Sequence, residues 1–437
     1  MSQKNRNNKY LMKHLYIYLI LAFLSLNAYC QFTDNYSYFS LHKLKPDSCR
    51  SEAIISYGNF ISSNSITSKF VNSMYQKKFI SDALKQQNKI KPVNYFASED
   101  NASISYAHIF DSLAGFEKTG IKVAFENSYH ADAAFSRDIY NLAFYGNKDY
   151  AGKTIDFSGS QFQFMQSQQL KIGVFKQAIS EEGPFTVYLG IGIVKGQNFN
   201  YLTVDTGKFF TSETGESIAF TADAKYFSSD TARKKWQHFN GMGACVDLAF
   251  VFEDKSSNYH ISCALTDIGF IRWNKNALFV PVDTSVFFDG ISIDSILWGK
   301  DTSLSSGISE DSILNAFYKH SKKTSFTKVM PEKVNLSITK YFFNKKLFST
   351  FGISYMYHAS CPFPLVYIKN EYLFKNQIGV IAQLAGGGYG NFQFGLGFNA
   401  RFSKYFAIQL MSNNIISPVL PEKTLSQHYA ARIILNF

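Results

Sequence analysis

The sequence predicts an all-β protein, a transmembrane antiparallel β-barrel of about 14 strands, with 12 to 16 strands compatible with the pattern. The first observation is strict alternation over residues 391–402, where even positions are apolar and mostly Phe, and odd positions are polar or Gly. Because successive side chains of a strand point to opposite faces, one face is apolar and the other polar. The second observation is that the last segment, about 427–437, repeats the pattern and ends on Phe437. The third is composition: the chain has 43 Phe and 27 Tyr but 9 Pro, which suits long strands with aromatic girdles.

Residues 1–30 have the pattern of a signal peptide. An apolar run of about a dozen residues, too short for a membrane helix, follows four basic residues. These are Lys4, Arg6, Lys9 and Lys13. Ala28 and Cys30 occupy the −3 and −1 positions, which predicts cleavage near Cys30, before Gln31. The alternative is a lipoprotein acylated on Cys30, which Tyr29 disfavours because that signal has a small residue there. We therefore expect an exported protein of the cell outer membrane, since no later run approaches the roughly 20 apolar residues of a membrane helix.

Residues 31–100 are the least barrel-like part and are predicted as a pre-barrel region or plug. Apolar residues at helical spacing over about 74–91 predict a short helix. Such a helix could lie inside the lumen or at its periplasmic mouth, and a simple surface helix accounts for the pattern equally well.

Residues 101–437 are predicted to form the barrel as one continuous domain. About eleven segments alternate clearly, and they fall in hairpins from 102–110 to 427–437. Weaker candidates near 157–165, 201–204, 217–224 and 365–373 raise the count to about 14, an even number as in bacterial single-chain barrels. The polar stretch 283–327, rich in Ser and Asp, is predicted as a long extracellular loop.

The charge of the chain argues against nucleic-acid binding, and the positions of two cysteines argue against a disulfide. The formal net charge is +11, and about +7 remains without residues 1–30. The basic residues are scattered, whereas a nucleic-acid binder clusters them on one face. We therefore expect outer-membrane lipids, and not nucleic acid, as partners. Cys245 and Cys263 fall on opposite faces of one predicted hairpin, so they should not bridge.

Candidate catalytic and cofactor motifs are weak. Gly395, Gly397 and Ala400 imitate a dinucleotide fingerprint, but they lie in a strand and open no helix. His358 with Ser360, or His428 with Ser426, could form a nucleophile and base, yet such proximity is common by chance. We predict no enzyme, no catalytic residues, no metal and no cofactor.

The stretch from Asp267 to Lys275 breaks the alternation just after a strand. The favoured interpretation is a strand end with Trp273 as an interfacial anchor. The alternative is a loop that folds into the lumen, with Asp267 and Arg272 at a constriction. In the last strand, one face is predicted to be the signal read by the barrel-assembly machinery: Tyr429, Ile433, Leu435 and Phe437.

Four segments together resemble a large family of uncharacterised outer-membrane β-barrels of Gram-negative bacteria, a domain of unknown function. They are 267–275, 240–244, 142–147 and the Phe-terminated last strand. The chain is more distantly similar to long-chain fatty-acid transporter barrels. That wider class implies fourteen strands, an N-terminal hatch in the lumen and the passage of hydrophobic molecules, although no clear hatch motif is present here.

Three functions follow as hypotheses. The first is a passive channel or transporter for a small molecule, with a hydrophobic ligand as one option, through a lumen partly plugged by N-terminal residues. The second is a non-transporting anchor or docking subunit for exported proteins that uses 283–327. The third, least favoured, is an outer-membrane hydrolase. Transport predicts a continuous lumen, docking predicts a sealed one, and a hydrolase predicts a Ser/His contact at the rim.

Overall fold

The computed structural model describes residues 50–230, 237–254, 259–288, 321–374 and 377–437. The predicted signal peptide and residues 31–49 lie outside this part. None of the helices in the described segments is long and apolar enough to cross a membrane.

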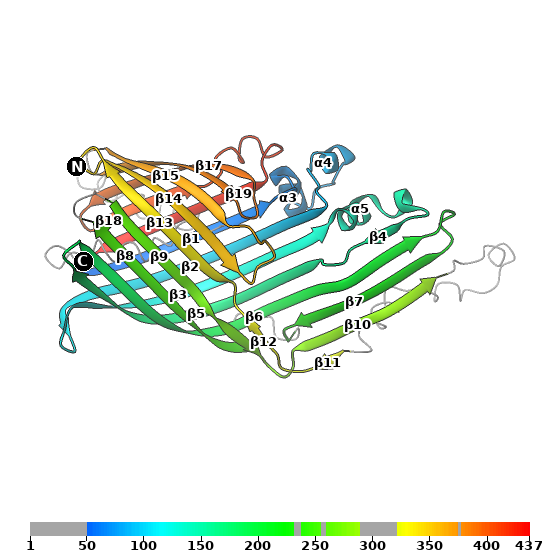
Figure 1. Cartoon of the computed structure of the whole chain (residues 1–437), viewed down its shortest axis with the longest axis horizontal. Helices are drawn as coiled ribbons and strands as arrows, with labels where there is room; N and C mark the ends of the chain where they lie inside the picture. The colour runs from blue at the N-terminus through cyan, green and yellow to red at the C-terminus, as the bar shows by residue number, and fades with distance from the viewer. Residues whose placement is uncertain (1–49, 231–236, 255–258, 289–320, 375–376) are drawn as a thin grey trace, which may run out of the picture.

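Fourteen antiparallel strands close into a ring, which confirms the predicted fold class and strand count (Figure 1). In ring order they are β1 (Ser51–Ser63), β2 (Val93–Leu113), β3 (Phe116–Ser136), β5 (Gln161–Ile179), β6 (Pro184–Thr211), β8 (Gly241–Asp254), β9 (Tyr259–Trp273), β13 (Glu332–Phe342), β14 (Leu347–Tyr357), β15 (Leu365–Phe374), β16 (Ile378–Gly387), β17 (Phe392–Ser403), β18 (Phe406–Ser412) and β19 (Ser426–Asn436). The last strand pairs with the first from Glu52 opposite Asn436 to Ser62 opposite Ser426, so the sheet has no free edge within the ring.

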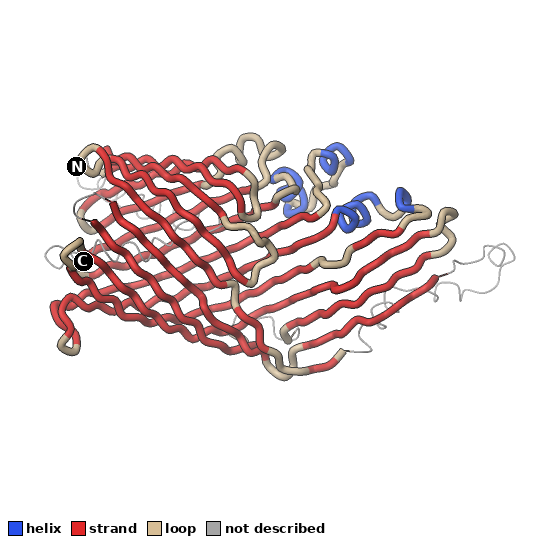
Figure 2. The backbone as a smooth tube through the Cα atoms, viewed as in Figure 1, coloured by secondary structure: helices blue, strands red, loops and turns tan. Residues whose placement is uncertain are grey.

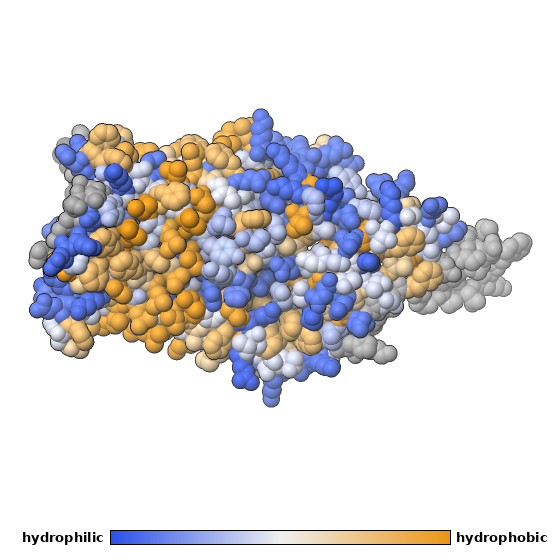
Figure 3. Space-filling view, viewed as in Figure 1, coloured by the Kyte–Doolittle hydropathy of each residue, from blue (hydrophilic) through white to orange (hydrophobic). Residues whose placement is uncertain are grey.

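Side chains alternate between the outside and the lumen as the sequence predicts. On β5, Leu170, Ile172 and Val174 are exposed, whereas Gln169 just before them and Lys171 between them are buried. Leu170 and Ile172 face outward beside their exposed partners on β3, Phe125 and Val123. Repeated around the ring, this pattern makes an apolar band on the outer surface, seen as the orange zone of Figure 3. An outward apolar band over a polar interior is the geometry of an outer-membrane β-barrel.

The two ends of the barrel differ. Short turns, the start of β1 and the end of β19 gather at one end, and the long connections gather at the other (Figures 1 and 2). The turn between β13 and β14 is tight, with Phe343, Asn344 and Lys345 all at positive φ. Because outer-membrane barrels have short periplasmic turns and longer extracellular loops, the end with the long connections is extracellular.

Residues 50–100, the described part of the region predicted to precede the barrel, already contain barrel strands. Strand β1 lies within this range and β2 begins at Val93, so barrel strands start earlier than expected. The alternation of β1 is hidden in the sequence because both of its faces are buried toward its extracellular end, from Gly58 to Ser63.

The helices of the described segments lie at the extracellular end, and not in the lumen or at the periplasmic mouth (Figure 1). They are α3 (Ser68–Tyr75), α4 (Asp82–Gln86), α5 (Arg137–Tyr145) and the 3-10 turn η2 (Lys148–Tyr150). Phe70, Leu84 and Tyr140 form their shared apolar core. The helical spacing of apolar residues near 74–91 therefore reflects the packing of these extracellular helices against one another.

A smaller sheet extends the barrel on the extracellular side. Strand β6 has 28 residues, far more than the roughly 9–11 that span a membrane, and its second half pairs with β7 (Ile218–Ser228). Strand β10 (Leu278–Phe288) pairs with β7, and the short strands β4 (Thr154–Asp156), β11 (Lys322–Lys323) and β12 (Thr327–Val329) complete the sheet or join the rim. The described ends of the predicted loop 283–327 lie at this end, the first within β10 and the second at the start of β12. Residues 289–320 lie outside the described part.

Candidate functional site

The lumen is lined by polar and charged side chains that are almost wholly buried. The alternation of the ring strands directs them inward. The charged ones include Glu52, Glu99, Lys122, Lys171, Asp247, Asp267, Lys333, Lys369 and Arg432. A buried charge is costly unless it is paired, so the partners of these groups determine what the lumen can do.

Three carboxylates converge on Lys171 of β5. Its Nζ lies 2.9 Å from Asp247 Oδ2, 2.8 Å from Asp267 Oδ1 and 3.3 Å from Glu126 Oε2. The acids come from β8, β9 and β3, so the cluster joins strands on both sides of β5. We call these four residues the Lys171 cluster.

Asp267 enters the lumen because the strand bulges there. It has a φ of +63°, the β8–β9 register shifts opposite it, and its N–H donates to Asp247 Oδ1 at 2.9 Å. The extra residue reverses the faces of the rest of β9, as bulges do. Asp267 is therefore buried on the lumen side. Arg272 is exposed on the outer face opposite Met242 of β8, so the structure does not bring the two residues of the predicted constriction together.

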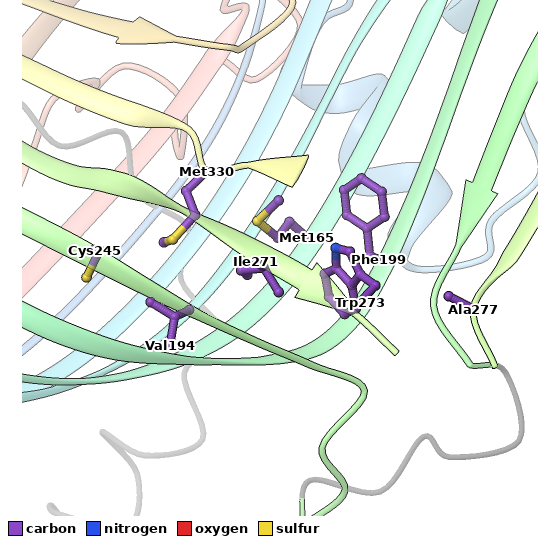
Figure 4. Packing of buried hydrophobic residues seen from close by; sticks show 8 residues of the cluster. All are labelled: Met165, Val194, Phe199, Cys245, Ile271, Trp273, Ala277 and Met330. Atoms are coloured by element: carbon purple, nitrogen blue, oxygen red, sulfur yellow. The ribbon is translucent and has the colours of Figure 1, made fainter. Parts of the chain in front are cut away.

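The same reversal turns Trp273 inward, so its predicted role as an interfacial anchor is wrong. Its side chain is 0% exposed and packs in an apolar cluster with Met165, Val194, Phe199, Cys245, Ile271, Ala277 and Met330 (Figure 4). The ring centroids of Phe199 and Trp273 are 5.2 Å apart. Gly196 and Gly241 leave room for the indole, since an added Cβ would come within 2.9 Å and 3.0 Å of its ring atoms.

Trp273→Ala is expected to lower the free energy of unfolding by about 3–5 kcal/mol, because it leaves a cavity in a closely packed cluster. Trp273→Phe should cost less, since it keeps a ring there and removes an indole N–H that has no partner among the described residues. Urea unfolding of the protein in detergent micelles measures both changes. A surface anchor would predict nearly equal stability for wild type and both variants.

An ion pair crosses the lumen. Lys333 Nζ of β13 contacts Glu99 Oε1 of β2, and five ring strands separate β2 from β13 on one side and seven on the other. The chain of contacts continues on the Glu99 side. His130 Nδ1 lies 3.9 Å from Glu99 Oε2, and His130 Nε2 lies 2.6 Å from Asp132 Oδ2. These contacts tie opposite walls of the barrel together.

The connection between β14 and β15 folds into the extracellular mouth. The backbone N–H of Ser360 donates to Asp132 Oδ1 at 3.2 Å, and the hydroxyl of Ser360 binds the same oxygen. Cys361 is buried in a cluster with Phe60, Ala97 and Tyr389, and burial raises the pKa of its thiol to about 11. This mouth loop, residues 358–364, therefore narrows the opening from inside.

A polar cavity of about 250 Å³ lies beside the mouth loop. We call it the mouth cavity; its walls come from β3, β5, β6, β12 and the loop, and its lining residues are Asp132, Gln161, Gln163, Tyr201, Lys328, Val329, His358, Ala359 and Ser360. A neighbouring cavity of about 20 Å³, lined partly by Glu99, His130 and Lys333, has room for about one water molecule. Buried ion pairs thus cross the lumen next to a cavity at its mouth.

The proposed nucleophile and base pairs are not assembled. The Ser360 hydroxyl binds Asp132, and His428 Nδ1 accepts a hydrogen bond from the backbone N–H of Asn413 at 3.0 Å. Ser426 Oγ accepts from the Asn414 side chain at 3.0 Å. Across the described segments, no group of three or more His, Cys, Asp or Glu residues is placed to hold a metal ion.

The predicted assembly signal lies on the outer face of β19. Ile433 and Phe437 are exposed, Tyr429 and Leu435 are half-buried, and Arg432 between them points inward. Recognition by the assembly machinery stays a prediction. Cys245 is buried toward the lumen and Cys263 lies on the outward face, and neither forms a disulfide.

The sequence matches one protein family, and several solved structures are distantly similar to this chain. A model described as "Family of unknown function (DUF5723)" matches residues 50–411. No curated protein is significantly similar in sequence. Among solved structures, a TodX monoaromatic hydrocarbon channel mutant is similar with a TM-score of 0.44 at 10% identity, covering 93% of this chain and 94% of that one. A Pseudomonas aeruginosa FadL homologue has a TM-score of 0.41 at 9% identity, covering 90% of this chain and 91% of that one.

Proposed function

The chain belongs to the family of unknown function DUF5723, and we propose that it is a gated outer-membrane channel for small molecules. One observation carries the proposal. The polar mouth cavity of about 250 Å³ adjoins a lumen that is crossed by buried ion pairs. Asp132 links the cavity to the ion pair, because it lines the cavity and also binds His130, which contacts Glu99.

Closure by charges favours a gate over a permanent seal. Replacing a buried ion pair by apolar side chains of similar volume is often neutral or stabilising by about 1–4 kcal/mol, so a permanent seal does not need charges. Paired charges can separate into a hydrated lumen, where water solvates each of them. Several buried atoms near the pair have no hydrogen-bond partner in the described part of the chain and could bind such water, including Glu99 Oε2 and His130 Nδ1.

The lining favours a small polar passenger. Seven of the residues around the mouth cavity have polar or charged side chains, and the lumen beyond it is charged. A hydrophobic passenger, which the distant resemblance implies, would have to displace these groups without replacing their hydrogen bonds.

Swelling of proteoliposomes tests the function. Wild-type protein should admit glycine and glycerol above the rate of protein-free liposomes and should exclude a trisaccharide, because brief openings pass only solutes near the size of the mouth cavity. Heat-modifiable gel mobility of the same sample shows that the barrel is folded. Swelling at the protein-free rate for every solute would contradict the proposal.

A docking subunit is the second candidate, and the extracellular sheet favours it. Strands β6, β7 and β10 project beyond the membrane-spanning ring and present a broad surface (Figure 1). The closed lumen is also what this function predicts. A folded barrel that passes no solute, even after the lumen charges are removed, would support docking over transport.

A further inference from the structure

We infer that the mouth cavity is a binding site for a small carboxylate, with Lys328 as the cation that it pairs with. The identity of the ligand as the molecule that the channel carries rests on the function proposed above. The existence of the binding site rests on the cavity alone.

Lys328 of β12 presents its charge to the cavity. Its Nζ lies 3.5 Å from the centroid of the Tyr201 ring and 5.4 Å from that of Phe227. Among the described residues, no carboxylate lies within ion-pair distance of this ammonium group. The aromatic faces position the cation but do not neutralise it, so its charge is available to an anion.

Gln163 of β5 supplies a second donor. Its side chain is 7% exposed, and its Nε2 has no hydrogen-bond partner in the described part of the chain. The residue lines the same cavity as Lys328. A buried amide donor without an acceptor is unfavourable, and a ligand carboxylate would satisfy it.

Asp132, the acidic residue of the lining, does not reverse this preference. Both of its oxygens are occupied, Oδ1 by the N–H and hydroxyl of Ser360 and Oδ2 by His130 Nε2 at 2.6 Å. Lys328 therefore carries the cavity charge that no described ion pair neutralises, and this charge is positive. A cationic ligand would face that ammonium group.

The cavity also limits the size and shape of the ligand. Its volume of about 250 Å³ corresponds to roughly eight water molecules. Tyr201 and Val329 form an apolar part of the wall beside Lys328. These features fit one carboxylate on a small, flat or branched apolar body.

Three probes of similar size test the inference: benzoate, benzyl alcohol and benzylamine. Binding to the purified full chain in detergent is measured by saturation-transfer NMR titration. Benzoate should bind saturably, and benzyl alcohol and benzylamine should bind at least about tenfold more weakly, because a charge-assisted contact is lost.

Variants identify the site. Lys328→Met should weaken benzoate binding at least about tenfold, and Gln163→Leu should weaken it severalfold. Lys323→Met, which removes an exposed lysine from β11 at the same end of the barrel, should leave binding unchanged. Heat-modifiable mobility confirms the fold of each variant.

Equal binding of benzoate and benzyl alcohol, or unchanged benzoate binding in folded Lys328→Met, would overturn the inference. Binding is measured without flux, so the two proposals fail separately. Lys328-dependent binding in a barrel that passes no solute would refute the channel and leave the carboxylate site in place.

Discussion

Replacing Glu99 and Lys333 together by Gln is expected to raise solute flux through the barrel by about tenfold or more. The two side chains meet across the lumen, and Gln at both positions keeps polar groups of similar volume without the attraction between opposite charges. If that attraction favours the closed state by about 1.4 kcal/mol, its loss raises the ratio of open to closed barrels about tenfold.

The measurement is the swelling rate of proteoliposomes in glycine. A matched control is the double neutralisation Asp205→Asn with Lys225→Gln, whose exposed pair at 2.6 Å lies on the extracellular sheet and outside the lumen. The control should leave flux unchanged. Equal rates for wild type, lumen variant and control would show that the cross-lumen pair does not gate the barrel.

Lys171→Met is expected to lower the free energy of unfolding by about 3–5 kcal/mol. The substitution leaves Glu126, Asp247 and Asp267 close together without the cation that they share. Removing one partner of a buried charge cluster costs this much because the remaining charges stay desolvated and repel one another.

Urea unfolding in micelles measures the effect, with Lys176→Met as the matched control. Lys176 lies on the same strand, but its side chain is exposed on the outer face. Adding Asp247→Asn to Lys171→Met should recover part of the lost stability, since one of the three buried charges is removed. Equal stability of the Lys171→Met and Lys176→Met variants would mean that water already solvates the cluster.

The alternation of apolar and polar residues predicts most of the fold, because a membrane-spanning strand must present one face to lipid and the other to the lumen. It fails for β1, where both faces are buried from Gly58 to Ser63. It also marks 201–204 as a separate strand, although these residues continue β6, because the strand leaves the membrane and its outer face no longer needs to be apolar.

The candidate site is less predictable. The stretch that begins at Asp267 stands out in the sequence, but one bulged residue decides which of its side chains face inward. That residue brings Asp267 and Trp273 inside and sends Arg272 outside. A sequence-based argument that assumes unbroken alternation cannot place all three correctly.

The ion pair across the lumen cannot be predicted from the sequence for a different reason. Glu99 and Lys333 are 234 positions apart, and closure of the ring brings them together. Each one is an ordinary polar residue on the inner face of its strand, as expected for a water-filled lumen. The sequence indicates that charged side chains line the lumen, but it does not indicate which of them form ion pairs.

Current recordings from single barrels in planar bilayers test the central claim most directly. A gated channel predicts brief, infrequent current steps for wild type and long open periods for the Glu99→Gln, Lys333→Gln variant at the same voltage and salt. Folded protein that inserts into the bilayer and gives no current steps in either form would contradict the account.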